Sequence, residues 1–220
     1  MNMRKVIILG AGGAGSELTF YIEDHNSKVG PDDKIKIVGY IDDSKKYWTK
    51  YKYNAPLLCN IDSYTPSKDE EVLIAVMEIK SRKKFIETML RKNAKIGSFI
   101  HHSVIKPENM EIGVGNIIFP FSILEKNAIV GNYNFLTTYC FISHDCVVGD
   151  NNFFSTAGIA GSVKVGDNNY FGIRSTVIPG IEIGSNNVVQ AGMVVNKNVK
   201  DDTTVFYRYK EQVMAIPKQY

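Results

Sequence analysis

Cysteine is scarce in this sequence, and it has neither a long apolar run nor a strong excess of one charge. The three cysteines, Cys59, Cys140 and Cys146, are odd in number and lack the spacing of metal ligands. A disulfide framework or a structural zinc site is therefore not expected. We interpret all three as small hydrophobic residues that are buried or half-buried.

No apolar run approaches the roughly 20 residues that a membrane-spanning helix requires. The N-terminal apolar run, residues 6–9, is also too short for the core of a signal peptide. We therefore expect a cytoplasmic protein without a membrane partner. The net charge is only +3, which gives no electrostatic reason to expect nucleic-acid binding.

Residues 1–97 alternate the signals of strands and helices. In order they predict strand, helix, strand, strand and helix, at residues 5–9, 16–24, 35–41, 72–76 and 79–93. Strands that alternate with helices are typical of a parallel sheet. We expect a small Rossmann-like α/β domain.

The rest of the chain carries a repeat instead. Pairs of an aliphatic residue and a glycine recur at steps of 18, 18, 17 and 18 residues, and an asparagine stands three positions after each glycine. These glycines are Gly113, Gly131, Gly149, Gly166 and Gly184. Within each step an apolar residue recurs every six positions, with one residue missing near residues 157–161.

This hexapeptide spacing predicts a triangular parallel β-solenoid over residues 98–200. Each unit forms one flat side with an aliphatic residue inward, and we expect Gly, Asn and Asp at the corners to accept left-handed backbone. A β-sandwich is the weaker alternative, because its turn signals would be less regular. Residues 201–220 leave the repeat and are expected to cap the open end.

The stretch from Ile142 to Asp150, with its His-Asp pair, accompanies the hexapeptides, an N-terminal glycine loop and Asp42-Asp43. Together they resemble the bacterial sugar acetyltransferases of the left-handed β-helix class, which include a sialic-acid O-acetyltransferase and a bacillosamine-pathway N-acetyltransferase. The resemblance implies a left-handed parallel β-helix, acetyl-CoA as co-substrate and a homotrimer. It also implies a nucleotide-sugar against the N-terminal domain, acetyl-CoA between neighbouring β-helices, and no nicotinamide cofactor or metal.

His144 is the expected catalytic base. Acetyl transfer from a thioester requires a group that takes a proton from the attacking amine or hydroxyl, and histidine suits this task near neutral pH. Asp145 follows it at a predicted corner, where it could bind and orient the imidazole. His144 is also the only histidine of residues 103–220, which disfavours a metal-dependent β-helix hydratase. We expect the preceding His101 and His102 to pack or to contact solvent.

The glycine loop at residues 10–15 fits the pattern G-x-G-x-x-G, which lets backbone amides approach a phosphate at a helix N-terminus. A nicotinamide reading is open, but 97 residues make only about half of a full dinucleotide fold. We therefore favour a nucleotide-sugar at this loop.

The resemblance assigns further residues by position. It implies that the Gly161 amide stabilises the oxyanion of the reaction. The implied acetyl-CoA groove is lined by Phe153, Ile173 and Ala191. The implied substrate residues are Gly12, Gly13, Asp42, Asp43, Ser44, Met77 and Lys80.

Three functions follow from these observations. The first is N-acetylation of the 4-amino group of a UDP- or dTDP-linked amino-deoxysugar for polysaccharide biosynthesis, by direct transfer with His144 as base. The second is O-acetylation of a sugar, as in the sialic-acid enzymes. The third is a non-catalytic β-helix scaffold that binds a nucleotide.

Overall fold

The computed structural model describes residues 3–207 of the chain, which begin with a four-stranded parallel sheet. The strand order is β3-β2-β1-β4. The elements are β1 (Arg4–Leu9), α1 (Gly13–Lys28), the 3-10 turn η1 (Pro31–Asp33), β2 (Ile35–Ile41), α2 (Lys45–Tyr51), β3 (Leu57–Cys59), β4 (Glu70–Ile74) and α3 (Ile79–Arg91). The α/β domain expected from the sequence is confirmed.

The sequence did not predict α2 or β3. The helix α2 buries none of its residues, so it carries no apolar stripe, and β3 is only three residues long. The strand predicted at residues 72–76 begins and ends two residues earlier, as β4. The helix α1 begins at Gly13, inside the glycine loop, rather than at Ser16.

The two longer helices cover opposite faces of this sheet. Successive side chains of a strand point to opposite faces. Val6 and Ile8 of β1 accordingly pack in the cluster that contains residues of α1, whereas Ile7 and Leu9 pack with residues of α3. The carboxyl ends of β1, β2 and β4 meet at one edge, which brings the loops after them together.

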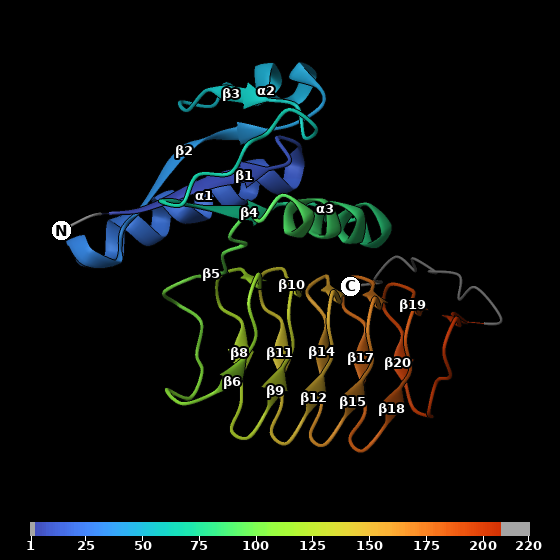
Figure 1. Cartoon of the computed structure of the whole chain (residues 1–220). Coiled ribbons are helices and arrows are strands. Elements are labelled where there is room, and N and C mark those ends of the chain that lie inside the picture. The colour runs from blue at the N-terminus through green and yellow to red at the C-terminus, as the bar shows by residue number, and fades with distance from the viewer. Residues whose placement is uncertain (1–2, 208–220) are drawn as a thin grey trace, which may run out of the picture.

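The second part of the chain is a left-handed parallel β-helix with three sides, which confirms the fold implied by the resemblance (Figure 1). The first side contains β5 (Phe99–Ile100), β7 (Ile117–Ile118), β10 (Phe135–Leu136), β13 (Phe153–Phe154), β16 (Tyr170–Phe171), β19 (Val188–Val189) and β21 (Thr204–Val205). The second contains β8 (Ile123–Leu124), β11 (Phe141–Ile142), β14 (Gly158–Ile159), β17 (Thr176–Val177) and β20 (Val194–Val195). The third contains β6 (Glu111–Ile112), β9 (Ile129–Val130), β12 (Val147–Val148), β15 (Lys164–Val165) and β18 (Glu182–Ile183).

The recurring glycines and asparagines act differently from the prediction. None of the glycines of the repeat pairs has a positive φ. A Cβ on Gly131 would instead lie 2.7 Å from the carbonyl oxygen of Gly149, so glycine is needed there for close stacking of coils. The asparagines are buried and form a ladder. The backbone N–H of Asn134 donates to the side-chain oxygen Oδ1 of Asn116, and the backbone N–H of Asn152 donates to Oδ1 of Asn134.

The left-handed corner residues stand three positions after the inward residues, apart from two shortened corners, at Thr156 and between the inward Val195 and Val199. Gly, Asn and Asp fill many of these corners, as predicted, but bulkier residues such as Phe121, Tyr139 and Arg174 also have positive φ. The first shortened corner contains Thr156, because the step from the inward Phe154 to the inward Ile159 is five residues instead of six. The missing residue therefore lies just before the predicted stretch of residues 157–161, rather than at Gly161.

The two domains are joined by a continuous apolar contact. Phe99, Phe135 and Phe153 point outward from the first side of the β-helix and belong to the same buried cluster as residues of β1 and α1. Arg82 of α3 is 2% exposed, and its guanidinium donates to the side chain and carbonyl of Asn151 at 2.7 and 3.0 Å. The α/β domain is thereby fixed beside the coils (Figure 1).

The repeat continues beyond the expected boundary at residue 200. Strand β21 pairs with β19 and extends the first side of the β-helix, so this segment does not leave the coil stack at residue 201. The rest of the expected cap, residues 208–220, lies outside the described residues. Within residues 3–207, no helix has the length and apolar character needed to cross a membrane.

Candidate active site

His144 lies on an outer corner of the β-helix, between its second and third sides. Ile142 points into the aliphatic column, and the chain then turns at Asp145, whose φ is +58°. The His144 side chain is 60% exposed, so the ring projects to solvent. Its Nδ1 lies 2.8 Å from Asp145 Oδ2, and Asn127 donates to the other carboxylate oxygen at 2.9 Å.

The carboxylate of Asp145 fixes the tautomer of the ring. Hydrogen bonds from His144 and then Asn127 lower the pKa of Asp145, which is therefore ionised and only accepts. His144 Nδ1 must then carry the hydrogen, which leaves the lone pair on Nε2 to take a proton from a substrate. An imidazole that a carboxylate holds in this way can act as a general base.

Gly161 lies directly against the His144 ring, in the next coil. A Cβ at Gly161 would lie 2.6 Å from both Nε2 and Cε1 of the ring, so only glycine leaves the ring in this position. Among the described residues, the Gly161 N–H has no hydrogen-bond acceptor. A free amide beside the basic nitrogen is the type of donor that stabilises an oxyanion.

The cysteines offer no nucleophile at this corner. Cys146, two residues after His144, is buried and its thiol donates to the carbonyl of Ala160 at 3.1 Å. Burial raises the pKa of this thiol, as it raises that of Cys140 to about 11. The interpretation of the cysteines as buried or half-buried residues is confirmed, with Cys59 the half-buried one.

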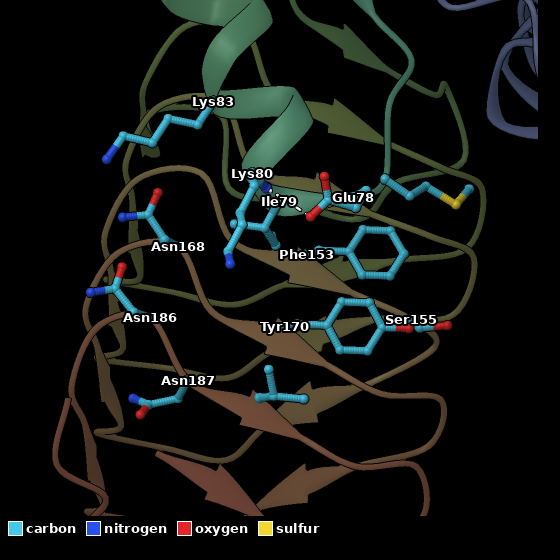
Figure 2. Close-up of a pocket in the computed structure, with 12 residues that line it drawn as sticks. Glu78, Ile79, Lys80, Lys83, Phe153, Ser155, Asn168, Tyr170, Asn186 and Asn187 are labelled. Carbon is cyan, nitrogen blue, oxygen red and sulfur yellow. Dashed lines mark hydrogen bonds between the residues drawn. The ribbon is translucent and has the colours of Figure 1, made fainter. Parts of the chain in front are cut away.

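A cleft of about 700 Å³ lies between the start of α3 and the first side of the β-helix (Figure 2). We call it the helix cleft. It brings together Met77 and Lys80, which were expected to bind the substrate, and Phe153, which was expected to line the acetyl-CoA groove. The rings of Phe153 and Tyr170 stack on its wall, with their centres 5.1 Å apart. Lys83 lies at its rim and adds a second positive charge.

A second cleft of about 520 Å³ adjoins the helix cleft and shares Tyr170 with it. We call it the corner cleft, because it extends to the corner between the first and second sides. Both remaining residues of the expected acetyl-CoA groove, Ile173 and Ala191, line it. The three groove residues therefore lie along one continuous surface.

The carboxylates after β2 hold the loops at the edge of the sheet. Asp42 accepts the N–H of Ala11 at 2.7 Å and that of Ser44 at 2.8 Å. Asp43 accepts the N–H of Ile61 at 3.0 Å. Both side chains therefore have structural partners, and Ser44 caps the start of α2 with its hydroxyl.

The glycine loop is built by its first and last glycines. Gly10 has a φ of +103°, and a Cβ on Gly15 would lie 2.0 Å from the carbonyl oxygen of Gly10. Gly12 and Gly13 at the start of α1 are half-buried and exposed, so they are accessible to a ligand.

The structure of one chain does not bring all expected residues together. His144, Asp145 and Gly161 meet at the corner between the second and third sides of the β-helix. The two clefts lie on the first side and at a different corner, and His144 lines neither of them.

Several residues around these sites were missed by sequence reasoning. Tyr170 belongs to the clefts but reads as an ordinary strand residue. Tyr53 donates its hydroxyl to the carbonyl of Ala11, and Glu78 caps α3 by accepting the N–H of Ser81 at 2.7 Å. An acidic residue just before a helical stripe is a capping signal, so Glu78 was the one that the sequence could have revealed.

Comparison with known proteins identifies the repeat and the fold. A family model described as the hexapeptide repeat of succinyl-transferase matches residues 162–197. A search of curated proteins found no match.

Several solved structures superpose on nearly the whole chain. PerB from Caulobacter crescentus, in complex with CoA and GDP-perosamine, is 20% identical, with a TM-score of 0.79 over 92% of this chain and 94% of that chain. The acetyltransferase domain of PglB from Neisseria gonorrhoeae FA1090, in complex with acetyl coenzyme A, is 19% identical, with a TM-score of 0.77 over 92% and 96%. WeeI from Acinetobacter baumannii AYE is 24% identical, with a TM-score of 0.76 over 92% and 96%. The chain thus contains a hexapeptide repeat and has the fold that these three proteins share.

Proposed function

We propose that this chain transfers the acetyl group of acetyl-CoA to the 4-amino group of a nucleotide-linked amino-deoxysugar, with UDP or dTDP as the nucleotide. The observation that carries this proposal is the exposed His144–Asp145 pair with the free amide of Gly161 against the ring. A base and an oxyanion donor within one small corner are the two groups that acyl transfer requires.

The reaction proceeds by direct attack in this proposal. The amine nitrogen forms a bond to the thioester carbon while His144 Nε2 takes the proton of the amine. The Gly161 N–H stabilises the negative charge that develops on the carbonyl oxygen. Collapse of the intermediate breaks the carbon–sulfur bond, and the CoA thiolate leaves with the proton from His144. The products are the acetamido sugar and CoA.

The two clefts suit anionic ligands that carry a planar base. Lys80 and Lys83 place positive charge at the helix cleft, and the stacked rings of Phe153 and Tyr170 offer an apolar wall. Both CoA and a nucleotide-sugar combine phosphates with a base. We assign the corner cleft to acetyl-CoA and the Met77–Lys80 end of the helix cleft to the nucleotide-sugar.

A homotrimer would unite the two halves of this site. Side chains exposed near His144 include the apolar Ile129 and Val147, which are 39% and 43% exposed on the third side of the β-helix. An exposed apolar strip is typical of a surface that binds another chain. A neighbouring copy that covers this strip would bring its clefts to the His144 corner.

The compared structures support the proposal. PerB was solved with CoA and GDP-perosamine. A variant of the Caulobacter crescentus GDP-perosamine N-acetyltransferase in which a histidine is replaced by alanine was also solved with CoA and GDP-perosamine; it has a TM-score of 0.75 at 18% identity over 92% of this chain and 93% of that chain. Acetyl-CoA and nucleotide-sugars are cytoplasmic metabolites, so the proposal includes a cytoplasmic location and a role in supplying sugars for polysaccharides.

The proposal is tested by release of CoA thiol across a panel of nucleotide-sugars. The panel contains UDP-, dTDP- and GDP-linked 4-amino sugars, each matched by the same sugar with a 4-hydroxyl group. We expect turnover with an amino sugar and an acetylated product in the mass spectrum. Turnover only with hydroxyl acceptors would instead identify a sugar O-acetyltransferase. If calorimetry detected no binding of acetyl-CoA, the result would favour the third function, a non-catalytic scaffold that binds a nucleotide.

A further inference from the structure

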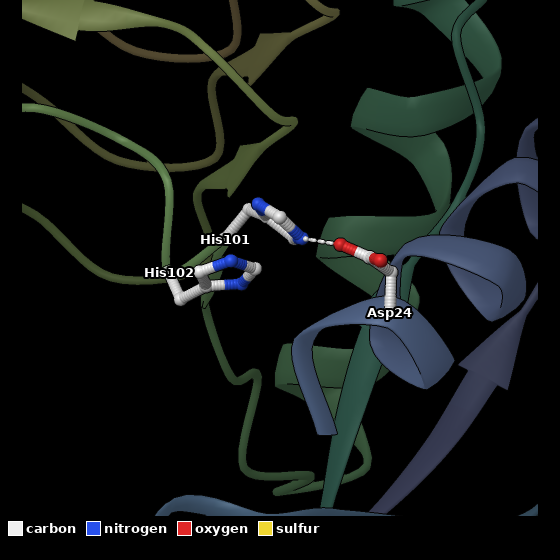
Figure 3. A group of neighbouring side chains, drawn as sticks. All are labelled: Asp24, His101 and His102. Atoms are coloured by element: carbon white, nitrogen blue, oxygen red, sulfur yellow. Dashed lines mark hydrogen bonds and ion pairs between the residues drawn. The ribbon is translucent and has the colours of Figure 1, made fainter. Parts of the chain in front are cut away.

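A group of metal-ligating side chains lies at the junction of the two domains, away from the proposed acetyltransferase site (Figure 3). Asp24 comes from the last turns of α1, whereas His101 and His102 directly follow β5. One ligand atom from each of the three side chains lies within 4.8 Å of the other two. Carboxylate and imidazole groups at this separation can share one metal ion.

His101 is already oriented as a ligand. Its side chain is 1% exposed, and Nε2 points to Asp24 Oδ2 at 3.1 Å (Figure 3). Two ligands of a tetrahedral zinc ion with bonds of about 2.0 Å lie about 3.3 Å apart, so this pair needs little movement. On the other side of the ring, Nδ1 lies 2.8 Å from Ser103 Oγ. The backbone N–H of Ser103 also donates to Nδ1, at 3.3 Å, so without a metal Nε2 carries the ring hydrogen and donates it to Asp24. When a metal takes Nε2, that hydrogen moves to Nδ1, where Ser103 Oγ can accept it.

A third histidine supports the ligands from behind. The backbone N–H of His102 donates to Nδ1 of His25, a residue of α1, at 3.0 Å. This bond holds the backbone of His102 beside α1. The His102 side chain is exposed and can turn its ring toward the ion.

We propose that Asp24, His101 and His102 form a binding site for one zinc-like divalent ion, with water as the fourth ligand. Zinc suits this mixture of nitrogen and oxygen ligands in a four-coordinate arrangement. The ion would connect α1 of the first domain to the first coil of the β-helix. Its role is structural, and the proposal is independent of the acetyltransferase reaction.

The test is metal titration of the full chain without a histidine tag. Zn²⁺ binding is followed by calorimetry, and Co²⁺ binding by the visible absorption of a tetrahedral complex. We expect one ion per chain, and a melting temperature that rises when Zn²⁺ is added. His102→Ala and Asp24→Asn, which change exposed or half-exposed side chains, should each weaken binding at least about tenfold.

His144→Ala is the matched control, because it removes another exposed histidine of the same chain. It should bind both metals as tightly as the unaltered protein. Equal loss of binding in this control and in the site variants would mean adventitious binding to surface histidines and overturn the proposal. Absence of a saturable one-to-one transition, or full affinity in both site variants, would also overturn it.

Discussion

At the scale of single residues, the contact between His144 and Gly161 depends on a glycine that follows a coil corner one residue short. The coil between them is one residue short, because the corner at Thr156 joins Phe154 to Ile159 by a five-residue step. The pairing of Val147 with Lys164 shows the resulting offset. The strand register pairs Ile142 with Ile159, which places Gly161 beside His144. The absence of a side chain on Gly161 leaves the space that the imidazole occupies, because a Cβ there would lie 2.6 Å from the ring.

The first prediction concerns His144. His144→Ala removes the base, so we expect turnover to fall by about 100-fold to 10,000-fold. Acetyl-CoA binding, measured by calorimetry, should be unchanged because His144 lines neither cleft. Turnover close to that of the unaltered enzyme would refute the assignment of His144 as base.

The second prediction concerns Gly161. In Gly161→Ala the added methyl group would lie 2.6 Å from the ring of His144 and must displace it. Because the ring is exposed, the melting temperature should change little while turnover falls by at least about tenfold through the displaced base. Steady-state kinetics and thermal unfolding check both expectations. If the melting temperature also fell strongly, so that the loss of turnover could be explained by unfolding, the glycine would serve only folding.

At the scale of elements, buried asparagines tie successive coils together. Asn116, Asn134, Asn152, Asn169 and Asn187 are each at most 1% exposed. The side-chain oxygens of the first four accept the N–H of the next asparagine at 2.8 Å. Each asparagine thus provides an acceptor for a buried backbone N–H of the next coil. The two-residue strands are too short to provide this hydrogen bond themselves.

The third prediction tests this ladder. Asn134→Ala leaves the N–H of Asn152 and the carbonyl of Gly149 without their partners. We expect the free energy of unfolding to fall by about 3 kcal/mol, since each buried unsatisfied group costs about 1–3 kcal/mol. Chemical denaturation measures this change.

The matched control is Asn196→Ala. Asn196 is exposed, and its side chain makes no hydrogen bond to another described residue. Its replacement should leave stability within about 0.5 kcal/mol of the original value. A similar loss in both variants would contradict the role of the ladder.

At the scale of the whole molecule, the proposed base and the clefts face different directions. The α/β domain lies over the first side of the β-helix, so the helix cleft forms where α3 meets that side, and the corner cleft continues from it along the β-helix (Figures 1 and 2). His144 projects from the corner between the other two sides. A second copy is the simplest way to place a cleft beside His144, since a ring of identical chains repeats one contact.

The fourth prediction follows from this geometry. Sedimentation should give about three times the chain mass of 24.6 kDa. Inactive His144→Ala chains should regain activity after they are unfolded and refolded together with Ile173→Trp chains, whose bulky ring blocks the corner cleft. With random pairing of neighbours, about one quarter of the sites would combine two intact halves. No recovery from well-folded mixed trimers would place the complete site within one chain.

The β-helix and the corner that carries His144 could both be predicted from the sequence. Each residue of a coil meets a partner about 18 positions away, so packing repeats as a period that can be read along the chain. Asp145 is likewise the chain neighbour of His144, and their contact needed no long-range information.

The way in which the two domains meet could not be predicted from the sequence and is seen only in the folded chain. The contact of His101 with Asp24 spans 77 positions, and that of Arg82 with Asn151 spans 69, with no repeat to predict either. The helix cleft likewise combines Met77 from one domain with Phe153 from the other. Such contacts depend on the complementary shape and polarity of two separately folded surfaces. Neither property follows from the period of a single chain segment.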